Sequence, residues 1–459
     1  MITLKASQIA AITGGTLHGD ADLLVTSSIE VDSRKCTAGS LFFALKGEHV
    51  DGHDFIADAQ KNGAVLSITE RKGETPCIVV SDSIVALGKL AQHVRQELSD
   101  LMVIGITGSQ GKTTTKDLLA HLLQIIGKTV APVGSFNNEI GAPLTILQCN
   151  EKTTFCIVEM GARHSGDITH LCEIAEPTIG VVLKVGTAHI GEFGDRQTIA
   201  RTKQELITSL PAHGTAVLGC YDEFTPAMAD GLNLNVITFG PGHDCMVRAT
   251  DVEIREGRPH FDLVTPAGRT TVGLRLIGAH QVANALAVAS VGHALGISLD
   301  VIAGSLSTAE PSSKWRMELH ELHDLLIIND SYNANPDSMA AALQTLALFA
   351  QERGGSAWAF LSTMHELGES ESKDHQEIGR VCVELGIDHV VCVGEPRFAV
   401  AESETTKFHQ AKSKEEALSL MAHVAPGDVI LIKASRAESL NELVAPMISH
   451  WSEREETHD

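Results

Sequence analysis

Long apolar runs are absent from this chain of 459 residues. No stretch approaches the roughly 20 consecutive apolar residues that a helix needs to span a bilayer. The most apolar stretches, such as residues 179–183, are short and end in polar residues, which is typical of buried strands. Residues 1–5 also lack the basic segment and apolar run of a secretory signal. We therefore expect neither membrane insertion nor secretion.

Closely spaced cysteines are missing as well. The nine cysteines are scattered, and no Cys-x-x-Cys pair occurs. This spacing argues against a zinc site and against a disulfide framework, and it is typical of free thiols in a reducing compartment. The sequence therefore predicts a cytoplasmic protein.

Positive charge is scarce, because 35 basic residues face 58 acidic ones and the formal net charge is −23. Such an excess of negative charge argues against nucleic acid as a partner, although a small basic site for phosphates inside a cleft remains compatible with it. The length is sufficient for about three domains, each with its own core.

The first 98 residues contain strand-like runs at 23–29, 40–45 and 77–80 and a helical stretch at 84–98. A strong strand–turn–helix unit follows, in which an apolar β-branched run at 101–107 leads through glycines into a helical leucine pattern at 113–126. Further strands are predicted at 154–159, 178–184 and 215–218. This alternation predicts a mostly parallel sheet with helices on both faces.

A polar segment containing Pro311, residues 309–313, predicts a domain boundary. Beyond it, strands are predicted at 325–329, 357–361, 389–393 and 429–433, with helices between them. One of these helices is well marked, with Asn335 as N-cap and Pro336 in the first turn. We therefore predict three α/β domains at residues 1–98, 99–310 and 311–459, of which the third is Rossmann-like.

The most specific motif is the glycine-rich turn, which reads GSQGKT at 108–113. Glycines let the backbone wrap around a phosphate, and the N-terminus of the following helix presents N–H groups to the anion. Lys112 would reach the β- and γ-phosphates of ATP, and the Thr113 hydroxyl would bind Mg²⁺. Ile106 stands where the usual pattern has glycine, so the chain carries only the shorter Gly-x-x-Gly-Lys-Thr form. The alternative interpretation is a glycine turn with an exposed lysine.

This loop resembles the nucleotide loop of the Mur ligases, and further matches follow in family order along nearly the whole chain. They are ITGSQGKTTTK (106–116), SFNNEIG (135–141), EMGA (159–162), TAH (187–189), GAHQVAN (278–284) and DSYNANPDSM (330–339). The resemblance implies that the central domain is a P-loop, parallel-sheet ATPase-like domain, and that the third domain closes over the nucleotide. It also implies that the first domain binds a UDP-sugar.

The resemblance implies a set of metal and catalytic residues. Glu159, at the end of a predicted strand, would bind Mg²⁺ together with Thr113 and His189. Lys203 would be carbamylated by CO₂, and the resulting anion would help to hold a second Mg²⁺ ion. Read alone, His189 fits a structural histidine and Lys203 a solvated helix lysine. Lys112, Lys203 and His189 are the implied catalytic residues.

Nucleotide and substrate contacts are implied in the same way. The nucleotide-binding residues would be Gly108, Ser109, Gln110, Gly111, Lys112, Thr113, Thr114, Asn138, Asn284, Arg316 and Asp330. The substrate residues would be Ser33, Arg34, Lys46 and Asp51 on the UDP side, and Asn333 and Asn335 in the third domain. An arginine suits a diphosphate because its planar guanidinium donates two parallel hydrogen bonds. Read alone, most of these residues also fit caps or surface turns.

Several positions depart from the family pattern. Lys184 stands where relatives usually carry asparagine, and Gln281 replaces an asparagine in the Gly-x-His-Asn segment. Ser362 and Thr363 replace a glycine–acidic pair. None of these changes removes a group that would bind phosphate or metal.

The reaction implied by the resemblance is ATP- and Mg²⁺-dependent ligation of D-Ala-D-Ala to UDP-N-acetylmuramoyl-tripeptide, by a monomer, through an acyl phosphate. The nearest alternative is the family member that adds the third stem-peptide residue, but its Asp-Asn-Pro-Arg motif is absent. Folylpolyglutamate synthase shares the loop but not the predicted first domain. A non-enzymatic P-loop binding module would bind nucleotide without acceptor-dependent turnover.

Overall fold

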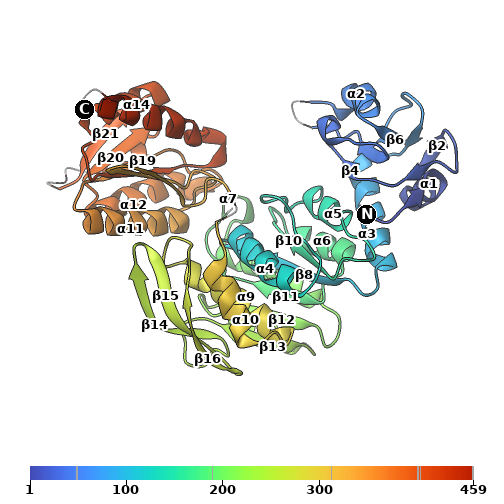
Figure 1. The fold of residues 1–459 in the computed structure, drawn as a ribbon, viewed down its shortest axis with the longest axis horizontal. Coiled ribbons are helices and arrows are strands. Elements are labelled where there is room, and N and C mark those ends of the chain that lie inside the picture. The colour runs from blue at the N-terminus through green and yellow to red at the C-terminus, as the bar shows by residue number, and fades with distance from the viewer. Residues whose placement is uncertain (48–49, 189, 312, 401–402, 404, 457–459) are drawn as a thin grey trace.

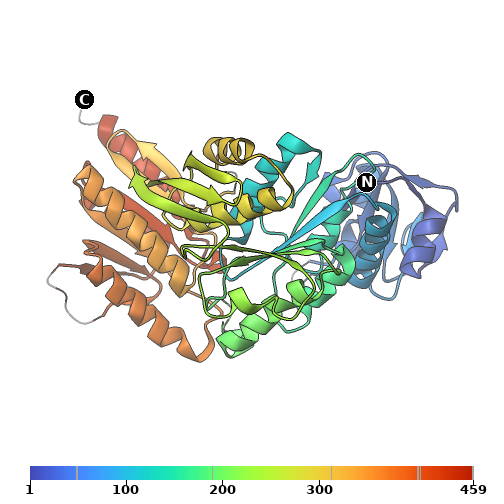
Figure 2. The same ribbon diagram turned by 90° about the horizontal axis from the view of Figure 1, so that it is seen from below.

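The computed structural model describes residues 1–47, 50–188, 190–311, 313–400, 403 and 405–456, so that His189 lies outside the described residues. The chain forms three units, each built around a sheet, and Figures 1 and 2 show the first and third at opposite ends of the central one. In the described part of the chain, no helix has both the length and the apolar character needed to cross a membrane.

The first unit contains a five-stranded sheet of order β2-β7-β6-β5-β4. Its elements are β1 Leu4–Lys5, α1 Ala6–Thr13, β2 Thr16–His18, β3 Leu24–Val25, β4 Ile29–Glu30, β5 Ser40–Phe43, α2 Ile56–Lys61, β6 Ala64–Thr69, β7 Cys77–Val79 and α3 Ser83–Glu97. The single strand predicted at 23–29 is wrong. The chain bends at Thr26 and Ser27, whose N–H groups both donate to the Gly39 carbonyl, so β3 pairs with β1 and β4 pairs with β5 in another sheet.

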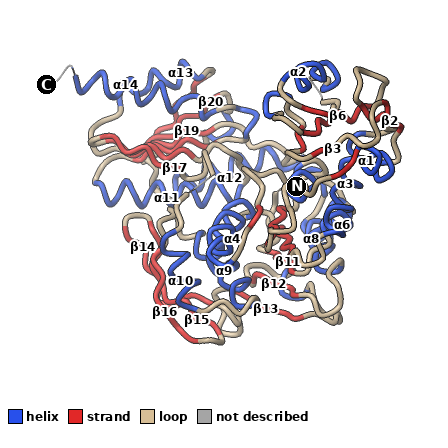
Figure 3. The backbone as a smooth tube through the Cα atoms, turned by 45° about the vertical axis from the view of Figure 1, so that its right-hand side comes forward, coloured by secondary structure: helices blue, strands red, loops and turns tan. Residues whose placement is uncertain are grey.

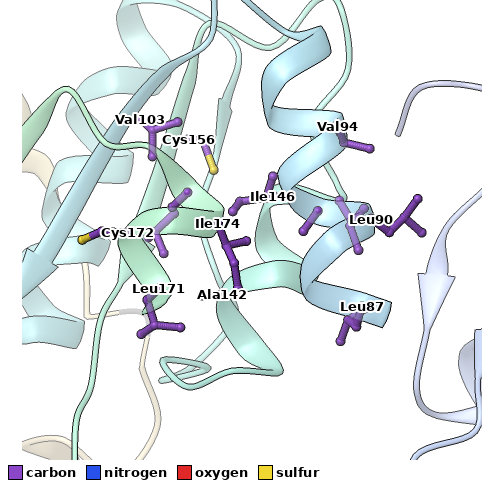
Figure 4. Close-up of a cluster of buried hydrophobic side chains, with 14 of the residues drawn as sticks. Leu87, Leu90, Val94, Val103, Ala142, Ile146, Cys156, Leu171, Cys172 and Ile174 are labelled. Atoms are coloured by element: carbon purple, nitrogen blue, oxygen red, sulfur yellow. The ribbon is translucent and has the colours of Figure 1, made fainter. Parts of the chain in front are cut away.

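Helix α3 joins the first unit to the central one. Asp82 caps it by accepting the N–H groups of Ile84 and Val85. It lies beside the central helices α5 (Gly141–Ile146) and α6 (Asp167–Ala175), where Gln92 and Arg95 donate to the Glu173 and Ala175 carbonyls. Its side chains Leu87, Leu90 and Val94 belong to the same apolar cluster as Ile146 of α5 and Ile174 of α6, and Figure 4 shows this cluster. All three side chains are fully buried, so one apolar core runs continuously through both units.

The central unit contains a six-stranded parallel sheet of order β13-β12-β11-β8-β10-β9. Its strands are β8 Met102–Thr107, β9 Thr129–Val130, β10 Phe155–Glu159, β11 Ile179–Val182, β12 Thr215–Gly219 and β13 Asn235–Phe239. Its remaining helices are α4 Lys112–Ile126, α7 Ile190–Phe193, α8 Arg196–Thr208, α9 Gln281–Ala294 and α10 Leu299–Thr308. Separate apolar cores cover the two faces of the sheet, which confirms the predicted layering.

An antiparallel sheet that the sequence analysis did not anticipate also belongs to the central unit. Its strands are β14 Arg248–Arg255, β15 Arg258–Thr265 and β16 Gly268–Gly273. Only alternate residues of β15 are buried, among them Phe261 and Leu263, which pack in the core formed with α9 and α10. Of the outward residues of β15, Arg258, His260 and Asp262 are polar and Val264 is apolar, so no continuous apolar run marks this strand in the sequence.

The third unit has a six-stranded sheet of order β17-β18-β22-β19-β20-β21, parallel except for the edge strand β17. Its strands are β17 Glu318–Leu322, β18 Leu325–Asn329, β19 Ala357–Leu361, β20 His389–Val393, β21 Lys407–Ala411 and β22 Val429–Lys433. Helices α11 Pro336–Arg353 and α12 Glu371–Glu384 cover one face, and α13 Lys414–Ser419 and α14 Val444–Glu456 cover the other (Figure 3). The predicted Rossmann-like layering is thus confirmed.

Candidate active site

The glycine-rich turn lies between β8 and α4, and its conformation depends on its glycines. Gly108 and Gly111 have φ angles of 152° and 82°, which side chains rarely adopt. A Cβ atom on Gly111 would also lie 2.3 Å from Oδ1 of Asn284. Lys112 opens α4, and its ammonium donates to the Gly108 carbonyl at 2.8 Å. The turn therefore has the backbone of a phosphate site, with its lysine folded over it.

Two neighbouring elements hold this turn in place. Ser109 accepts the N–H of Gly186 at 2.8 Å, which fixes the segment that follows β11. Asn284 in α9 accepts a bond from Thr115 at 3.3 Å, and its amide donates to Gln281 at 2.7 Å. Gln281 therefore orients Asn284 toward the turn.

Glu159 ends β10 and is almost completely buried. One carboxylate oxygen accepts a hydrogen bond from the Asn137 amide at 2.9 Å. The other, Oε2, has no hydrogen-bond partner among the described residues. A buried carboxylate oxygen without a partner is destabilising unless a cation or a ligand satisfies it, so Glu159 has the chemistry of a ligand for a hard cation.

Lys203 lies in α8 and is 7% exposed. Burial, and next the positive charge of Lys112, lower the pKa of Lys203 to about 7. Burial also lowers the pKa of Lys112, with Arg316 adding to the shift and Glu159 opposing it. Lys112, which is half-buried, and Arg316 thus place positive charge at this point of an otherwise acidic protein, which favours a polyanionic ligand there.

The third unit contributes the opposite wall. Arg316 donates to the Thr113 hydroxyl at 3.0 Å, and its guanidinium stacks over the Tyr332 ring at 4.0 Å. Asp330 accepts a bond from the Lys433 ammonium at 2.6 Å. Asn335 caps α11 and also accepts a bond from Gln110 at 3.0 Å. Residues that were predicted from separate motifs therefore form hydrogen bonds between the central unit and the third unit.

A cavity of about 1110 Å³ lies between these walls. Of the predicted residues, it is lined by Ser109, Gln110, Gly111, Lys112, Thr113, Thr114, Asn138, Glu159, Lys203, Asn284, Arg316, Asp330, Asn333 and Asn335. A smaller cavity of about 290 Å³ shares Thr114, Gln281 and Arg316 with it and extends along α4 to Pro311.

The predicted residues of the first unit do not line either cavity. Arg34 is exposed and forms a bidentate pair with Asp32, with both N–O distances 2.9 Å. Lys46 pairs with Asp51 through an isolated bridge, and Asp51 accepts bonds from the backbone and ring of His53. Ser33 is buried, and its carbonyl accepts a bond from Asn62.

Residue-by-residue reasoning missed several lining residues. Asn137 holds Glu159, Tyr332 supports Arg316, and Lys433 binds Asp330. Asn137 and Tyr332 lie inside the quoted motifs, and Lys433 ends a predicted strand, so position alone could have indicated them. Arg163 and Glu366, which line the same cavity, carry no comparable signal.

Three family models match the chain. They are "Mur ligase family, catalytic domain" at residues 26–98, "Mur ligase middle domain" at 106–292 and "Mur ligase, glutamate ligase domain" at 315–436. Together they span most of the three units described above.

Similar proteins match over almost the full length. The UDP-N-acetylmuramoyl-tripeptide–D-alanyl-D-alanine ligase of Mycobacterium bovis is 40% identical, with 98% of each chain covered. A crystal structure of MurF from Acinetobacter baumannii has a TM-score of 0.88 at 33% identity and covers 98% of this chain and 99% of its own. MurF from Thermotoga maritima, solved in complex with ADP, has a TM-score of 0.81 at 31% identity, covering 94% and 99%. The chain therefore belongs to the Mur ligase family.

Proposed function

We propose that this protein joins D-Ala-D-Ala to UDP-N-acetylmuramoyl-tripeptide, with ATP converted to ADP and phosphate, in the synthesis of peptidoglycan precursors. The observation that carries the proposal is the full-length similarity to ligases named for this reaction. The cavity supports it, because one wall carries a phosphate-binding turn and the other carries polar groups for a second substrate.

The chemistry explains why ATP is needed. A carboxylate is a poor electrophile, because its substitution would expel oxide. Transfer of the γ-phosphoryl group to the tripeptide carboxylate gives an acyl phosphate, and phosphate is a good leaving group when the dipeptide amine attacks. Lys112 and Arg316 would neutralise charge on the phosphates during transfer, and closure of the two walls would exclude water.

The residues present fit Mg²⁺. Oε2 of Glu159 is a buried oxygen without a partner, and the Thr113 hydroxyl lies in the same cavity. We propose that Thr113, Glu159 and His189 hold Mg²⁺, and that a carbamate on Lys203 helps to hold a second ion. A neutral amine adds CO₂, and the lowered pKa of Lys203 favours the neutral form. Bound Mg²⁺ would offset negative charge on the phosphate oxygens.

The remaining assignments belong to the same proposal. The domains are residues 1–98, 99–310 and 311–459, and the protein acts as a cytoplasmic monomer. Ser33, Arg34, Lys46 and Asp51 bind the UDP end. Asn333 and Asn335 face the peptide substrates, Asn138 and Asn284 contact the nucleotide, and the smaller cavity beside Thr114 holds its base.

A coupled assay of ADP release tests this function. We expect turnover only when ATP, UDP-N-acetylmuramoyl-tripeptide and D-Ala-D-Ala are all present, and both the lysine and the diaminopimelate tripeptides should be compared. Turnover with UDP-muramoyl-dipeptide and a free diamino acid instead would identify the ligase of the third stem residue. ATP binding without acceptor-dependent turnover would indicate a binding module.

A further inference from the structure

A short segment of the third unit touches the central unit at the edge of the large cavity. The segment, residues 364–368, follows β19, and it meets helix α7. The N–H of Gly191 in α7 donates to the carbonyl of Glu366 at 3.1 Å. Beside it, the Arg163 guanidinium lies 3.3 Å from the Glu366 carboxylate. The contact therefore includes a backbone hydrogen bond and an ion pair near the protein surface.

Two glycines make this approach possible. A Cβ atom on Gly191 would lie 2.6 Å from the Gly368 nitrogen and 2.9 Å from the Glu366 carbonyl oxygen. A Cβ atom on Gly368 would lie 2.7 Å from the Gly191 Cα atom. Both neighbours are backbone atoms, so no side chain can rotate away to make room. Any side chain at Gly191 therefore requires the two units to move apart.

The third unit holds the segment in shape from its own side. The buried His375 ring accepts the N–H of Met364 at 2.9 Å, and its other nitrogen lies 2.7 Å from the Glu371 carbonyl. His365 donates its N–H to Ser435 at 2.9 Å. These bonds all lie within the third unit, so the segment keeps its form whether or not it touches α7.

In the central unit, the contact adjoins residues that form a wall of the candidate active site. Helix α7 follows residues 184–188, and Gly186 in that segment is bound to Ser109 of the phosphate-binding turn. Ala188 lines the cavity, and the buried Thr187 hydroxyl has no partner among the described residues. A hold on α7 therefore restrains residues 184–188, which come shortly before this helix in the chain and are bonded to the phosphate-binding turn through Gly186.

We propose that Gly191 and Gly368 form a backbone latch that closes the third unit onto the central unit and positions residues 184–188 for phosphoryl transfer. They are positioning residues, because they act through the segment and not on the reacting atoms. The positioning role rests on the proposed ligase function, whereas the latch itself requires only that the two units close when nucleotide binds.

Gly191→Ala is the decisive variant, and Gly304→Ala is its matched control. Both glycines lie in helices without a left-handed φ, so alanine suits the local backbone at either site. No atom lies within 4 Å of a Cβ on Gly304. The two variants gain the same methyl group, but only the one at Gly191 meets the third unit.

Three measurements on the full-length protein decide the matter. In small-angle scattering, wild type and Gly304→Ala should contract when a non-hydrolysable ATP analogue and tripeptide substrate are added, and Gly191→Ala should contract less. The kcat of Gly191→Ala for ligation should fall at least tenfold, while its thermal midpoint without ligand matches that of Gly304→Ala. Contraction and kcat equal to wild type would overturn the latch.

Two further outcomes are informative. A clearly lower midpoint of unliganded Gly191→Ala would also overturn the proposal, because the contact would then be permanent packing. If wild type contracts with nucleotide and Gly191→Ala does not, but no D-Ala-D-Ala ligation occurs in either, then the latch stands and the proposed reaction fails.

Discussion

Toward the first unit, the central unit presents leucine and isoleucine side chains beside a few hydrogen bonds, such as those from Gln92 and Arg95 to carbonyls of α6. Toward the third unit it presents mainly lysine, serine, glutamine and glycine. The first contact belongs to one apolar core that includes Ile9 of α1, Leu90 of α3 and Ile174 of α6. The second is made of hydrogen bonds and ion pairs such as Gln110–Asn335 and Arg163–Glu366. Among the described residues, Ile277 is the one side chain of the central unit that belongs to an apolar core of the third unit.

This difference indicates which joint moves. Separating the first unit would expose buried apolar side chains, at about 25 cal/mol for each Å². Separating the third unit would mainly exchange hydrogen bonds between protein groups for hydrogen bonds to water, with a net change of only about 0.5–1.5 kcal/mol each. The candidate active site lies at the second joint, where opening would admit substrates and closure would then exclude water.

The largest expected effect is at the polar joint. Lys112→Ala removes the cation that folds over the phosphate-binding turn, and loss of one preorganised partner lowers rates by about 10²–10³. We expect a fall in kcat of that size with little change in thermal stability. Lys89→Ala, an exposed lysine on α3, is the control and should keep full activity. ADP release near the wild-type rate from Lys112→Ala would contradict the assignment of this turn to the ATP phosphates.

Lys203→Ala should be nearly inactive, because it removes the amine that would carry the carbamate. A short carboxylic acid in the buffer should restore part of the activity, since it supplies an anion with two hard oxygens. Lys203→Arg should not be rescued, because a guanidinium neither adds CO₂ nor binds metal. Arg201→Ala, an exposed position on the same helix, should remain active. Full activity of Lys203→Ala in CO₂-depleted buffer would end the carbamate proposal.

At the apolar joint, Leu90→Ala should destabilise the protein by about 2–5 kcal/mol, the usual range for a buried leucine. Turnover per folded molecule should stay near that of wild type, because the Leu90 side chain lines neither cavity. Val85→Ala on the solvent side of α3 is the control, and we expect a change within about 0.5 kcal/mol. Chemical denaturation measures both. Equal stabilities of the two variants would contradict a shared core.

The smallest effect should come from acid, and in the third unit we expect it to act on a pair of histidines. His389 and His409 lie 3.0 Å apart, and burial, then neighbouring positive charge, lowers the pKa of each. Each of the two imidazoles therefore binds a proton less readily in the folded protein than in the unfolded chain, which becomes protonated as the pH falls through about 6.5. The contribution of the two histidines to the free energy of unfolding is therefore present above that pH and is lost below it. In a calorimetric scan, one transition should shift downward between pH 7.5 and 5.5, and less so in His409→Gln; a shift shared equally by all transitions would mean that the units unfold together.

Sequence reasoning succeeded where local signals act alone. The β8–turn–α4 unit carries its own glycines, and α11 carries its own cap in Asn335, so both were placed nearly to the residue. It failed at β14–β16, whose strands have one polar face, and at residues 23–29, where tertiary pairing splits one run into two strands. The contact of Gly191 with Gly368 could not be predicted from the sequence either, because the close approach of two distant backbone segments depends on how the units pack.

Of the candidate site, the motifs indicated the walls of the cavity but not how their residues bind one another. Tertiary packing brings Asn137 to Glu159 and Lys433 to Asp330, whereas the bond between Gln281 and Asn284 follows from their spacing of three residues within α9. Contacts between residues that are distant in the sequence follow no fixed spacing, so a sequence motif does not predict them. The first-unit residues, including Arg34, lie away from the cavity, so their proposed role in binding UDP depends on how a long substrate spans the two units.

Distance measurements on two doubly labelled variants, one carrying labels at Lys72 and Glu151 and the other at Glu151 and Glu352, test most directly which joint moves. Spin labels at the exposed positions Lys72, Glu151 and Glu352 would report the first-to-central and central-to-third distances. On addition of an ATP analogue and UDP-N-acetylmuramoyl-tripeptide, we expect the Glu151–Glu352 distribution to become narrower and to centre on the separation in this structure, while the Lys72–Glu151 distribution stays unchanged. A change confined to the Lys72–Glu151 pair would contradict the account, because the apolar joint would then be the one that moves.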